Sequence, residues 1–325
     1  MRYHARGMAL YLTEANVRDL LPMGVCLDAV EAAFTHWGEG RATNRPRSRV
    51  AMAGSMLHLL SATSEPLGRM AAKVYATSAG GARFVVLLFD AASSELLAIV
   101  EADRLGQMRT GAASGIATRR LARPDAQILG VLGSGWQARS QVEAIATTRR
   151  LREIRAWARD RGRLIDFCAA VVKLTGVPVQ PAVSAEAAVN GADIVVTATS
   201  SPEPVLRGSW LSPGTHINAI GSNRADRREI DANAVQRSEL IVVDAKDQAR
   251  LEAGDLLLAT AAPGQPAPID RAVELVEILA GRHPGRQGER QITLFKSLGI
   301  GLEDLAAASA VYDRAIAAGV GRPCP

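Results

Sequence analysis

The sequence predicts an α/β protein in which a doubly wound parallel sheet is joined to a second, α+β domain. From residue 127 to 244, short apolar runs alternate with helical segments, a pattern typical of parallel strands connected by helices. From 45 to 101, partly alternating apolar runs follow one another and are divided by Gly, Ser, Pro and Asp. Such runs indicate an antiparallel sheet.

The N-terminal part combines two expected helices with this sheet. Thr13 precedes a short helical pattern, and 24–37 repeats apolar residues at steps of three and four. A further helix, rich in small residues, is expected at 105–122, and Arg123-Pro124-Asp125 ends it. The strands are expected at 48–51, 55–61, 70–77, 84–89 and 95–101, with 90–94 as a hairpin connection.

A dinucleotide fingerprint, G-x-G-x-x-A, opens the second region. Gly133, Gly135 and Ala138 follow a strand-like run at 128–132 and begin a helix at 137–148, the context that this motif requires. The motif predicts a Rossmann-type domain with a pyrophosphate at the helix N-terminus. Further strands are expected at 153–158, 177–179, 193–198, 215–221 and 240–244, with helices at 161–174 and 185–189.

The C-terminal segment 301–318 places Leu302, Leu305, Tyr312 and Ile316 on one helical face. A helix after the last strand can return to the N-terminal domain and complete it. We therefore expect one domain at 1–121 and 300–325, and a Rossmann domain at 122–299.

Composition excludes several functions. The 325 residues carry a net charge of +5, mostly through arginine, but the basic clusters lack aromatic interleaving and any nucleic-acid motif. We expect no membrane span and no signal peptide, because no apolar run is long enough. Three distant cysteines fit a reducing cytoplasm, and five scattered histidines lack ligand spacing, so we expect no metal.

Three cations in apolar or small-residue surroundings are candidates for the chemistry. They are Arg49, Lys73 and Arg109, in S-R-V-A-M, M-A-A-K-V-Y and G-Q-M-R-T-G-A-A-S. Such groups are seldom buried unless they are paired, and a substrate carboxylate would pair them. Salt bridges to nearby Glu or Asp are the alternative interpretation.

Several segments together resemble the ornithine cyclodeaminase/μ-crystallin family. They include K-V-Y-A-T, E-A-D-R-L-G-Q-M-R-T-G-A-A-S-G-I-A-T, G-V-L-G-S-G-W-Q-A, N-A-I-G-S-N-R-A-D-R-R-E-I-D and T-L-F-K-S-L-G-I-G-L-E-D-L-A-A-A. The resemblance runs from about residue 10 to the C-terminus. It implies an NAD(P)-dependent enzyme acting on amino acids or their imines, in which the domain at 1–121 and 300–325 is the substrate-binding and dimerisation domain and forms a homodimer.

The resemblance also assigns roles to residues. Arg49, Lys73 and Arg109 match the carboxylate-binding positions, and Lys73 is the nearest candidate to protonate or deprotonate a substrate nitrogen. The positions that the resemblance places at the cofactor are Thr110, Gly133, Ser134, Gly135, Trp136, Gln137, Ala198, Thr199, Ser200, Lys296 and Ser297.

Two departures bear on the substrate. Asn223 stands where ornithine cyclodeaminases have an Asp, and an amide cannot act as a base at neutral pH. His58 matches the acidic position that receives the ornithine ammonium, although it is also consistent with an ordinary histidine on a sheet face. Both argue against a diamine substrate, while Asp226 is interpreted as structural.

The end of the second parallel strand indicates the cofactor. NAD enzymes commonly place an acidic residue there, whereas this chain has Ala158 followed by Arg159, with Arg161 and Arg163 near. NADPH is favoured over NADH, although Asp160 could reach a ribose by a shifted turn.

The sequence therefore predicts an NAD(P)H-dependent reductase of 2-imino acids. Cyclic ketimines such as 1-pyrroline-2-carboxylate or 1-piperideine-2-carboxylate are the natural substrates to test, and open-chain imino acids stay open. The alternatives are an ornithine cyclodeaminase, an alanine-type amino-acid dehydrogenase, or a non-catalytic protein that binds NADPH or a small ligand.

Overall fold

The computed structural model describes residues 8–261 and 264–324. By its internal contacts the chain divides into two compact units. Unit 1 comprises the chain up to Arg109 together with the segment from Gly299 onward, and unit 2 is Thr110–Leu298. Helix α3 (Asp103–Leu121) begins in the first and ends in the second. The domain boundaries expected at 121/122 and 299/300 stay a prediction.

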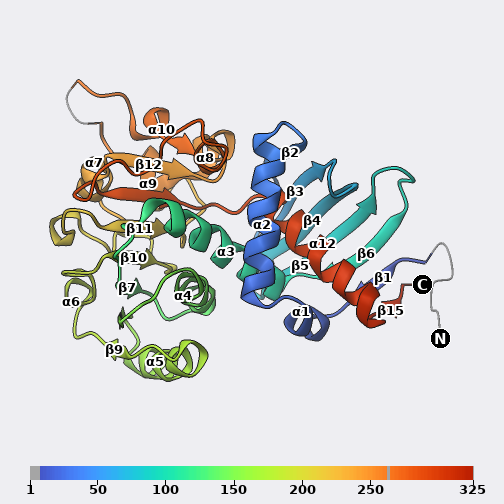
Figure 1. Ribbon diagram of the computed structural model, residues 1–325, viewed down its shortest axis with the longest axis horizontal. Coiled ribbons are helices and arrows are strands. Elements are labelled where there is room, and N and C mark those ends of the chain that lie inside the picture. The colour runs from blue at the N-terminus through green and yellow to red at the C-terminus, as the bar shows by residue number, and fades with distance from the viewer. Residues whose placement is uncertain (1–7, 262–263, 325) are drawn as a thin grey trace. The chain divides into compact units, whose positions relative to one another are not determined.

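Unit 1 is built on one mixed sheet (Figure 1). Its seven strands, within the described residues, run in the order β15-β1-β6-β5-β4-β3-β2. All neighbours are antiparallel except β1 and β6, which are parallel. The strands are β1 (Leu10–Leu12), β2 (Ala42–Met52), β3 (Ser55–Ser64), β4 (Arg69–Ser78), β5 (Gly81–Asp90), β6 (Leu96–Glu101) and β15 (Arg322–Pro323).

Helices cover one face of this sheet. Helix α12 (Gly301–Ala318) packs on β3 and β4 and against α2 (Met23–Gly38), while α1 (Glu14–Leu20) packs against α12. Burial alternates along β4, where Ala71, Lys73 and Tyr75 are the buried residues. Because successive side chains point to opposite faces, Lys73 occupies a position that would otherwise hold an apolar core residue.

A bulge in β2 changes which arginine is buried. Arg45 pairs with Ser61 and Ser48 pairs with Leu59, so β2 carries one residue more than β3 between these pairs. Pro46, which has no N–H to donate, lies in this irregular stretch. The arginine that follows it, Arg47, is 7% exposed.

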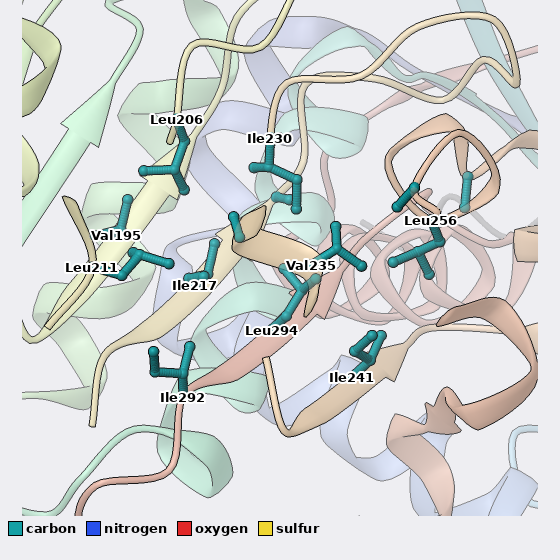
Figure 2. Close-up of a cluster of buried hydrophobic side chains, with 14 of the residues drawn as sticks. Val195, Leu206, Leu211, Ile217, Ile230, Val235, Ile241, Leu256, Ile292 and Leu294 are labelled. Carbon is teal, nitrogen blue, oxygen red and sulfur yellow. The ribbon is translucent and has the colours of Figure 1, made fainter. Parts of the chain in front are cut away.

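Unit 2 is built on a fully parallel sheet in the order β13-β12-β14-β11-β10-β7-β8-β9. The central strands β10, β11, β12 and β14 are buried at every position, as expected when helices cover both faces. Figure 2 shows one of its hydrophobic clusters, in which Ile217, Ile241 and Leu294 come from three neighbouring strands. The strands are β7 (Ile128–Leu132), β8 (Glu153–Trp157), β9 (Val179–Pro181), β10 (Ile194–Thr197), β11 (His216–Ala219), β12 (Leu240–Val243), β13 (Val273–Glu274) and β14 (Thr293–Lys296).

Short helices connect these strands. Gly176, in the left-handed conformation, ends α5, and Asp231 caps the first turn of α7 through the backbone N–H of Ala234. The helices of unit 2 after α3 are α4 (Trp136–Thr148), α5 (Arg161–Thr175), α6 (Ala185–Val189), α7 (Ala232–Arg237), α8 (Lys246–Glu252), α9 (Gly254–Leu257), α10 (Pro268–Arg271) and α11 (Leu275–Leu279), with a 3₁₀ turn at Gly208–Trp210.

The predicted fold class is confirmed, and the differences are local. The expected strand at 177–179 begins two residues later, as β9, and the short strands β1, β13 and β15 were not expected. β14 was not expected either, although it lies between β12 and β11 inside the sheet. Within the described residues, no helix combines the length and apolar character that a membrane crossing requires.

Candidate functional site

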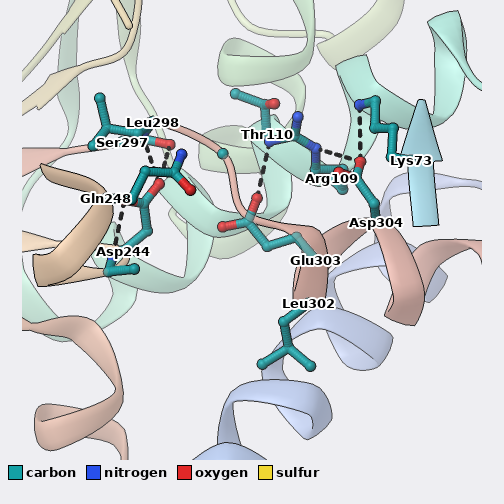
Figure 3. A network of polar contacts seen from close by, with 12 residues as sticks. Lys73, Arg109, Thr110, Asp244, Gln248, Ser297, Leu298, Leu302, Glu303 and Asp304 are labelled. Atoms are coloured by element: carbon teal, nitrogen blue, oxygen red, sulfur yellow. Dashed lines mark hydrogen bonds and ion pairs between the residues drawn. The ribbon is translucent and has the colours of Figure 1, made fainter. Parts of the chain in front are cut away.

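Lys73 and Arg109 meet at one carboxylate in unit 1. Lys73 Nζ donates to Asp304 Oδ1 over 2.9 Å, and Arg109 Nε donates to the same oxygen over 2.9 Å (Figure 3). Arg109 Nη1 also donates to Glu303 Oε2 over 3.0 Å. Both carboxylates belong to the first turn of α12, and all four residues are buried.

Arg47 approaches the same region, whereas Arg49 lies farther along the strand. Arg47 Nη2 donates to the carbonyl of Gly299 over 3.0 Å. A Cβ on Gly299 would lie 2.0 Å from Arg109 Nη1, so a side chain there would displace the guanidinium. Arg49 is half-buried and faces His58 across the β2–β3 ladder. The structure therefore adds Arg47 to the cations predicted from the sequence.

These contacts set the charge states in the cluster. Burial lowers the pKa of Lys73 to about 8, with Asp304 acting in the opposite direction and Arg109 and Arg47 lowering it further. Although burial opposes it, the pKa of Arg109 is raised above its usual value by Asp304 and Glu303. The Asp304 carboxyl has a lowered pKa, because Arg109 and Lys73 outweigh the effect of burial. Asp304 is thus ionised at neutral pH.

His58 belongs to an aromatic row across β3, β4 and β5. Its ring stacks on Tyr75 at a centroid distance of 4.2 Å, and Tyr75 stacks on Phe84 at 4.7 Å. His58 Nε2 lies 3.1 Å from Thr77 Oγ1. Burial, followed by Arg49 and Arg47, lowers the pKa of His58 to about 4, so the ring is neutral at pH 7. A neutral His58 brings no negative charge to balance an ammonium group.

The predicted pyrophosphate turn lies in unit 2, between β7 and α4. Gly133 adopts φ +118°, and a Cβ there would lie 2.3 Å from the carbonyl oxygen of Ala198. Gly135 is the N-cap residue of α4 and offers no side-chain cap, and a Cβ on it would meet no atom within 4 Å. Ala138 is fully buried in the cluster that contains Leu129. The open first turn of α4 fits a phosphate group.

A cavity of about 630 Å³ lies beside this turn. Arg159, Arg163 and Arg139 line it, as does Asp166. Asp160, which also lines it, caps α5 by accepting from the backbone N–H of Arg163 over 3.0 Å. The predicted cofactor residues among its lining are Gly133, Ser134, Gly135, Arg159, Ala198, Thr199 and Ser200. Those outside the lining are Thr110, Trp136, Gln137, Lys296 and Ser297.

Lys296 is held inside unit 2 by two acceptors. Its Nζ lies 2.8 Å from Asp255 Oδ2 and donates to the carbonyl oxygen of Ser222 over 2.5 Å. Lys296 and Asp255 are fully buried. Because Ser222 precedes Asn223, the ammonium fixes the backbone that carries the predicted substrate amide. Ser297 is buried as well, with Oγ 3.4 Å from Asp244 Oδ2 (Figure 3).

Glu229 joins the ends of two neighbouring strands. Its carboxylate accepts from the backbone N–H and the hydroxyl of Thr199 over 2.6 and 2.7 Å, and from the Thr197 hydroxyl over 2.9 Å. It also accepts from the Gly221 N–H over 2.6 Å. Asp255 Oδ1 in turn accepts from the Glu229 N–H over 2.6 Å. Asp226, by contrast, is exposed and paired with Arg224 over 2.8 Å.

The residues that sequence reasoning missed are mainly carboxylates. Glu303 and Asp304 lie in the segment G-L-E-D-L. Asp304 is 231 residues from Lys73 and 195 from Arg109, and Glu303 is 194 residues from Arg109, so nothing in the sequence indicated the pairing. Arg47 was hidden by the bulge at Pro46, because strict alternation along β2 does not distinguish it from Arg49. The signal that could have pointed to Asp304 is the adjacent pair Glu303-Asp304 in the first turn of a helix whose other residues there are apolar or small.

Comparisons with known proteins place these features in a family. The sequence profile of the ornithine cyclodeaminase/mu-crystallin family matches residues 8–319. Ketimine reductase mu-crystallin of Mus musculus is 39% identical over 228 residues, which are 70% of this chain and 68% of that protein. A Delta(1)-pyrroline-2-carboxylate reductase of Bacillus cereus is 35% identical over 237 residues, 73% of this chain and 72% of that protein.

A solved structure extends the similarity over nearly the whole chain. It is Thermococcus litoralis Delta(1)-pyrroline-2-carboxylate reductase in complex with NADH and L-proline. The TM-score is 0.91 at 32% sequence identity, with 96% of this chain and 99% of that chain covered.

Proposed function

Because the chain belongs to the ornithine cyclodeaminase/mu-crystallin family, we propose that it is an NADPH-preferring reductase of 2-imino acids. Three relatives in this family carry names of imine-reducing enzymes, and one of them is solved with NADH and L-proline. The proposed products are the corresponding 2-amino acids. The observation that carries the proposal is the buried set of Lys73, Arg109 and Arg47 in unit 1.

This cation set suits a 2-imino acid. Guanidinium groups such as those of Arg109 and Arg47 bind carboxylates in a fixed geometry. Lys73, with a pKa of about 8, is protonated at neutral pH and able to donate a proton to the substrate nitrogen. The nicotinamide cofactor, when bound, supplies the hydride. Positioning and fixed positive charge in a buried site would provide much of the rate acceleration.

The substrate class is inferred from His58 in unit 1 and from Asn223, which the family resemblance assigns to the substrate. A neutral His58 beside two arginines disfavours a cationic side chain, and Asn223 lacks the basicity that cyclodeamination would ask of this position. His58, Tyr75 and Phe84 form a row of stacked rings, and Phe84 contacts the Lys73 ammonium, so the lysine has a flat apolar group beside it. A cyclic ketimine such as 1-pyrroline-2-carboxylate or 1-piperideine-2-carboxylate is therefore the first substrate to test.

NADPH preference rests on the arginines of the unit 2 cavity. Ala158 replaces the acidic residue that would bind a ribose 2′-hydroxyl, and Arg159 follows it. Asp160 is engaged by the N-terminus of α5, which disfavours the alternative in which it binds the ribose. Arg159→Ala should lower the NADPH over NADH preference by about 10- to 100-fold, the range expected for a lost charged hydrogen bond. Arg161→Ala is the matched control, since Arg161 does not line the cavity.

We also propose a homodimer through the sheet of unit 1. Val50, Met52, Leu57 and Leu59 lie on the face opposite Lys73 and are 42–73% exposed. An exposed apolar patch of this kind is typical of an interface. Light scattering should give the mass of two chains, and a monomer across the micromolar range would contradict it.

The proposed activity is tested by NADPH and NADH oxidation against a panel. The panel contains 1-pyrroline-2-carboxylate, 1-piperideine-2-carboxylate, and pyruvate, glyoxylate or oxaloacetate with ammonium. Turnover of a cyclic imine supports the proposal, while activity only with an oxo acid and ammonium indicates an amino-acid dehydrogenase. Ammonia release from ornithine with NAD would indicate a cyclodeaminase, and tight NADPH binding without any turnover a non-catalytic binding protein.

A further inference from the structure

One carboxylate oxygen organises the cations of unit 1. Asp304 Oδ1 accepts from Lys73 Nζ and from Arg109 Nε, each over 2.9 Å. The three side chains are 1%, 3% and 9% exposed, in the order Asp304, Lys73, Arg109. A short buried carboxylate with two strong donors has little freedom, because its own backbone is in the first turn of α12.

Two of the charged groups near Lys73 are cations that oppose its positive charge. Arg109 comes from α3 and Arg47 from β2, and both are cations. Phe84 of β5 presents its ring to the ammonium, with the centroid 5.3 Å from Lys73 Nζ, and such a cation–π contact favours the charge only weakly compared with a carboxylate. Glu303, the second carboxylate of α12, contributes its charge to the cluster through Arg109. Asp304 is therefore the group that directly compensates the Lys73 ammonium.

The neighbouring backbone leaves the ammonium in one place. A Cβ on Gly106 of α3 would lie 2.9 Å from Lys73 Nζ, so the helix passes within contact distance of the amine. The carbonyl of Gly299 accepts from Arg47, and the same glycine packs against Arg109. Burial and pairing thus fix the orientation as well as the charge of this lysine.

We propose that Asp304 is a positioning residue of the reaction, which orients Lys73 and keeps its amine protonated at neutral pH. The inference rests on the proposed imine reduction. In that step an N–H bond of the Lys73 ammonium breaks and an N–H bond forms on the substrate nitrogen. A hydride from a bound nicotinamide would form the C–H bond at the imine carbon, the C=N π pair would move to nitrogen to take up the proton, and Lys73 would regain a proton from solvent.

The decisive experiment observes the lysine itself and needs no substrate. The chain has four lysines, Lys73, Lys173, Lys246 and Lys296, so protein labelled with [ε-¹³C]lysine gives a simple spectrum. The Lys73 signal is identified by its absence in Lys73→Arg. Its titration midpoint should fall by about 1–3 pH units in Asp304→Asn, the effect of removing an adjacent opposite charge.

Glu303→Gln is the matched control, because this carboxylate contacts Arg109 rather than Lys73. Its Lys73 midpoint should move less than that of Asp304→Asn. An unchanged midpoint in Asp304→Asn that still binds NADPH would overturn the inference. If Asp304→Asn does not fold, Asp304→Glu decides instead. The restored charge should keep the midpoint near the wild-type value while the displaced carboxylate lowers kcat at least tenfold, and a wild-type kcat would overturn the positioning role.

Kinetics give an independent readout. Asp304→Asn should lose imine reduction at pH 7.5 and recover part of it as the pH is lowered, because acid restores the proton on Lys73. A purely structural lesion would not recover, and that result would contradict the proposal. If the wild-type protein reduces no imine, the proposed function fails, whereas the lysine titration still decides whether Asp304 controls Lys73.

Discussion

The two buried lysines of this chain lie in opposite electrostatic surroundings. Lys73 of unit 1 shares its carboxylate with Arg109 and has Arg47 near it. Among the side chains of Lys73, Arg109, Arg47, Glu303 and Asp304 there are three cations and two carboxylates, an excess of one positive charge. Such an excess attracts an anionic substrate.

Lys296 of unit 2 is surrounded by acceptors. It pairs with Asp255 and with a backbone carbonyl, and the carboxylate of Glu229 lies in the same buried network. The positive charge of Lys296 is therefore compensated by groups of the protein itself. Burial and an aspartate partner are common to both lysines, so neither distinguishes a reactive lysine from a structural one. We infer that the balance of the charges around each lysine distinguishes the two.

The largest expected effect is the loss of catalysis on substitution of Lys73. Lys73→Met should lower kcat/KM on the best imine by about 10²- to 10⁴-fold, the usual contribution of a general acid or base. NADPH binding should be retained, because Lys73 does not line the cavity beside the dinucleotide turn. Steady-state kinetics with fluorescence titration of NADPH make the measurement. Full activity would remove Lys73 from the mechanism.

The same substitution at Lys296 should lower the free energy of unfolding. Lys296→Met leaves Asp255 buried without its cation and should cost about 3–5 kcal/mol of unfolding free energy, measured by urea denaturation. Lys246→Met, at a half-buried lysine of α8, should change stability by less than about 0.5 kcal/mol. A weaker NADPH affinity at unchanged stability would instead place Lys296 at the cofactor, as the family resemblance implies.

A smaller effect is expected at Glu229. Glu229→Gln keeps the shape but turns one acceptor oxygen into a donor that faces the donors of Thr197, Thr199 and Gly221. The loss should be about 1–3 kcal/mol, with a raised KM for NADPH because the Thr199 loop loosens. Glu239→Gln, at an exposed position, is the control. If Glu229→Gln and Glu239→Gln were equally stable, Glu229 would not stabilise the ends of β10 and β11.

The smallest effect is the pH dependence of the wild-type enzyme. The pKa of Lys73 is lowered to about 8, so the ammonium is present below that pH and is lost as the pH rises through it. If the ammonium donates the proton, kcat falls about tenfold for each pH unit above 8. A pH–rate profile that stays flat up to pH 10 would show that Lys73 does not act as the acid.

Much of the architecture was predictable, because it depends on local patterns. The glycine turn at Gly133 and the helix at Gly301–Ala318 were read from short segments and are confirmed. β14 was not, because T-L-F-K has only two apolar residues between a polar and a charged one, whereas I-V-V-T of β10 and L-I-V-V of β12 contain longer apolar runs. Strands buried on both faces give no alternation, which is the other signal that sequence offers.

The site was predictable for its cations and not for their partners. Lys73 and Arg109 stand out because charged residues rarely occur in such apolar or small-residue surroundings. Their carboxylates come from a helix almost two hundred residues or more away, which sequence spacing cannot indicate. Lys296 was assigned to the cofactor by the family resemblance alone, and only the structure reveals its contacts with Asp255 and Ser222.

The most direct test of this account is single-turnover reduction of 1-pyrroline-2-carboxylate by NADPH at pH 7, comparing wild type, Lys73→Met and Lys296→Met. The account predicts a rate constant lowered by about 10²-fold or more in Lys73→Met. In folded Lys296→Met the rate constant should stay within about tenfold of wild type. Similar losses in both variants, or a larger loss in Lys296→Met, would contradict the assignment of the chemistry to the lysine with excess positive charge around it.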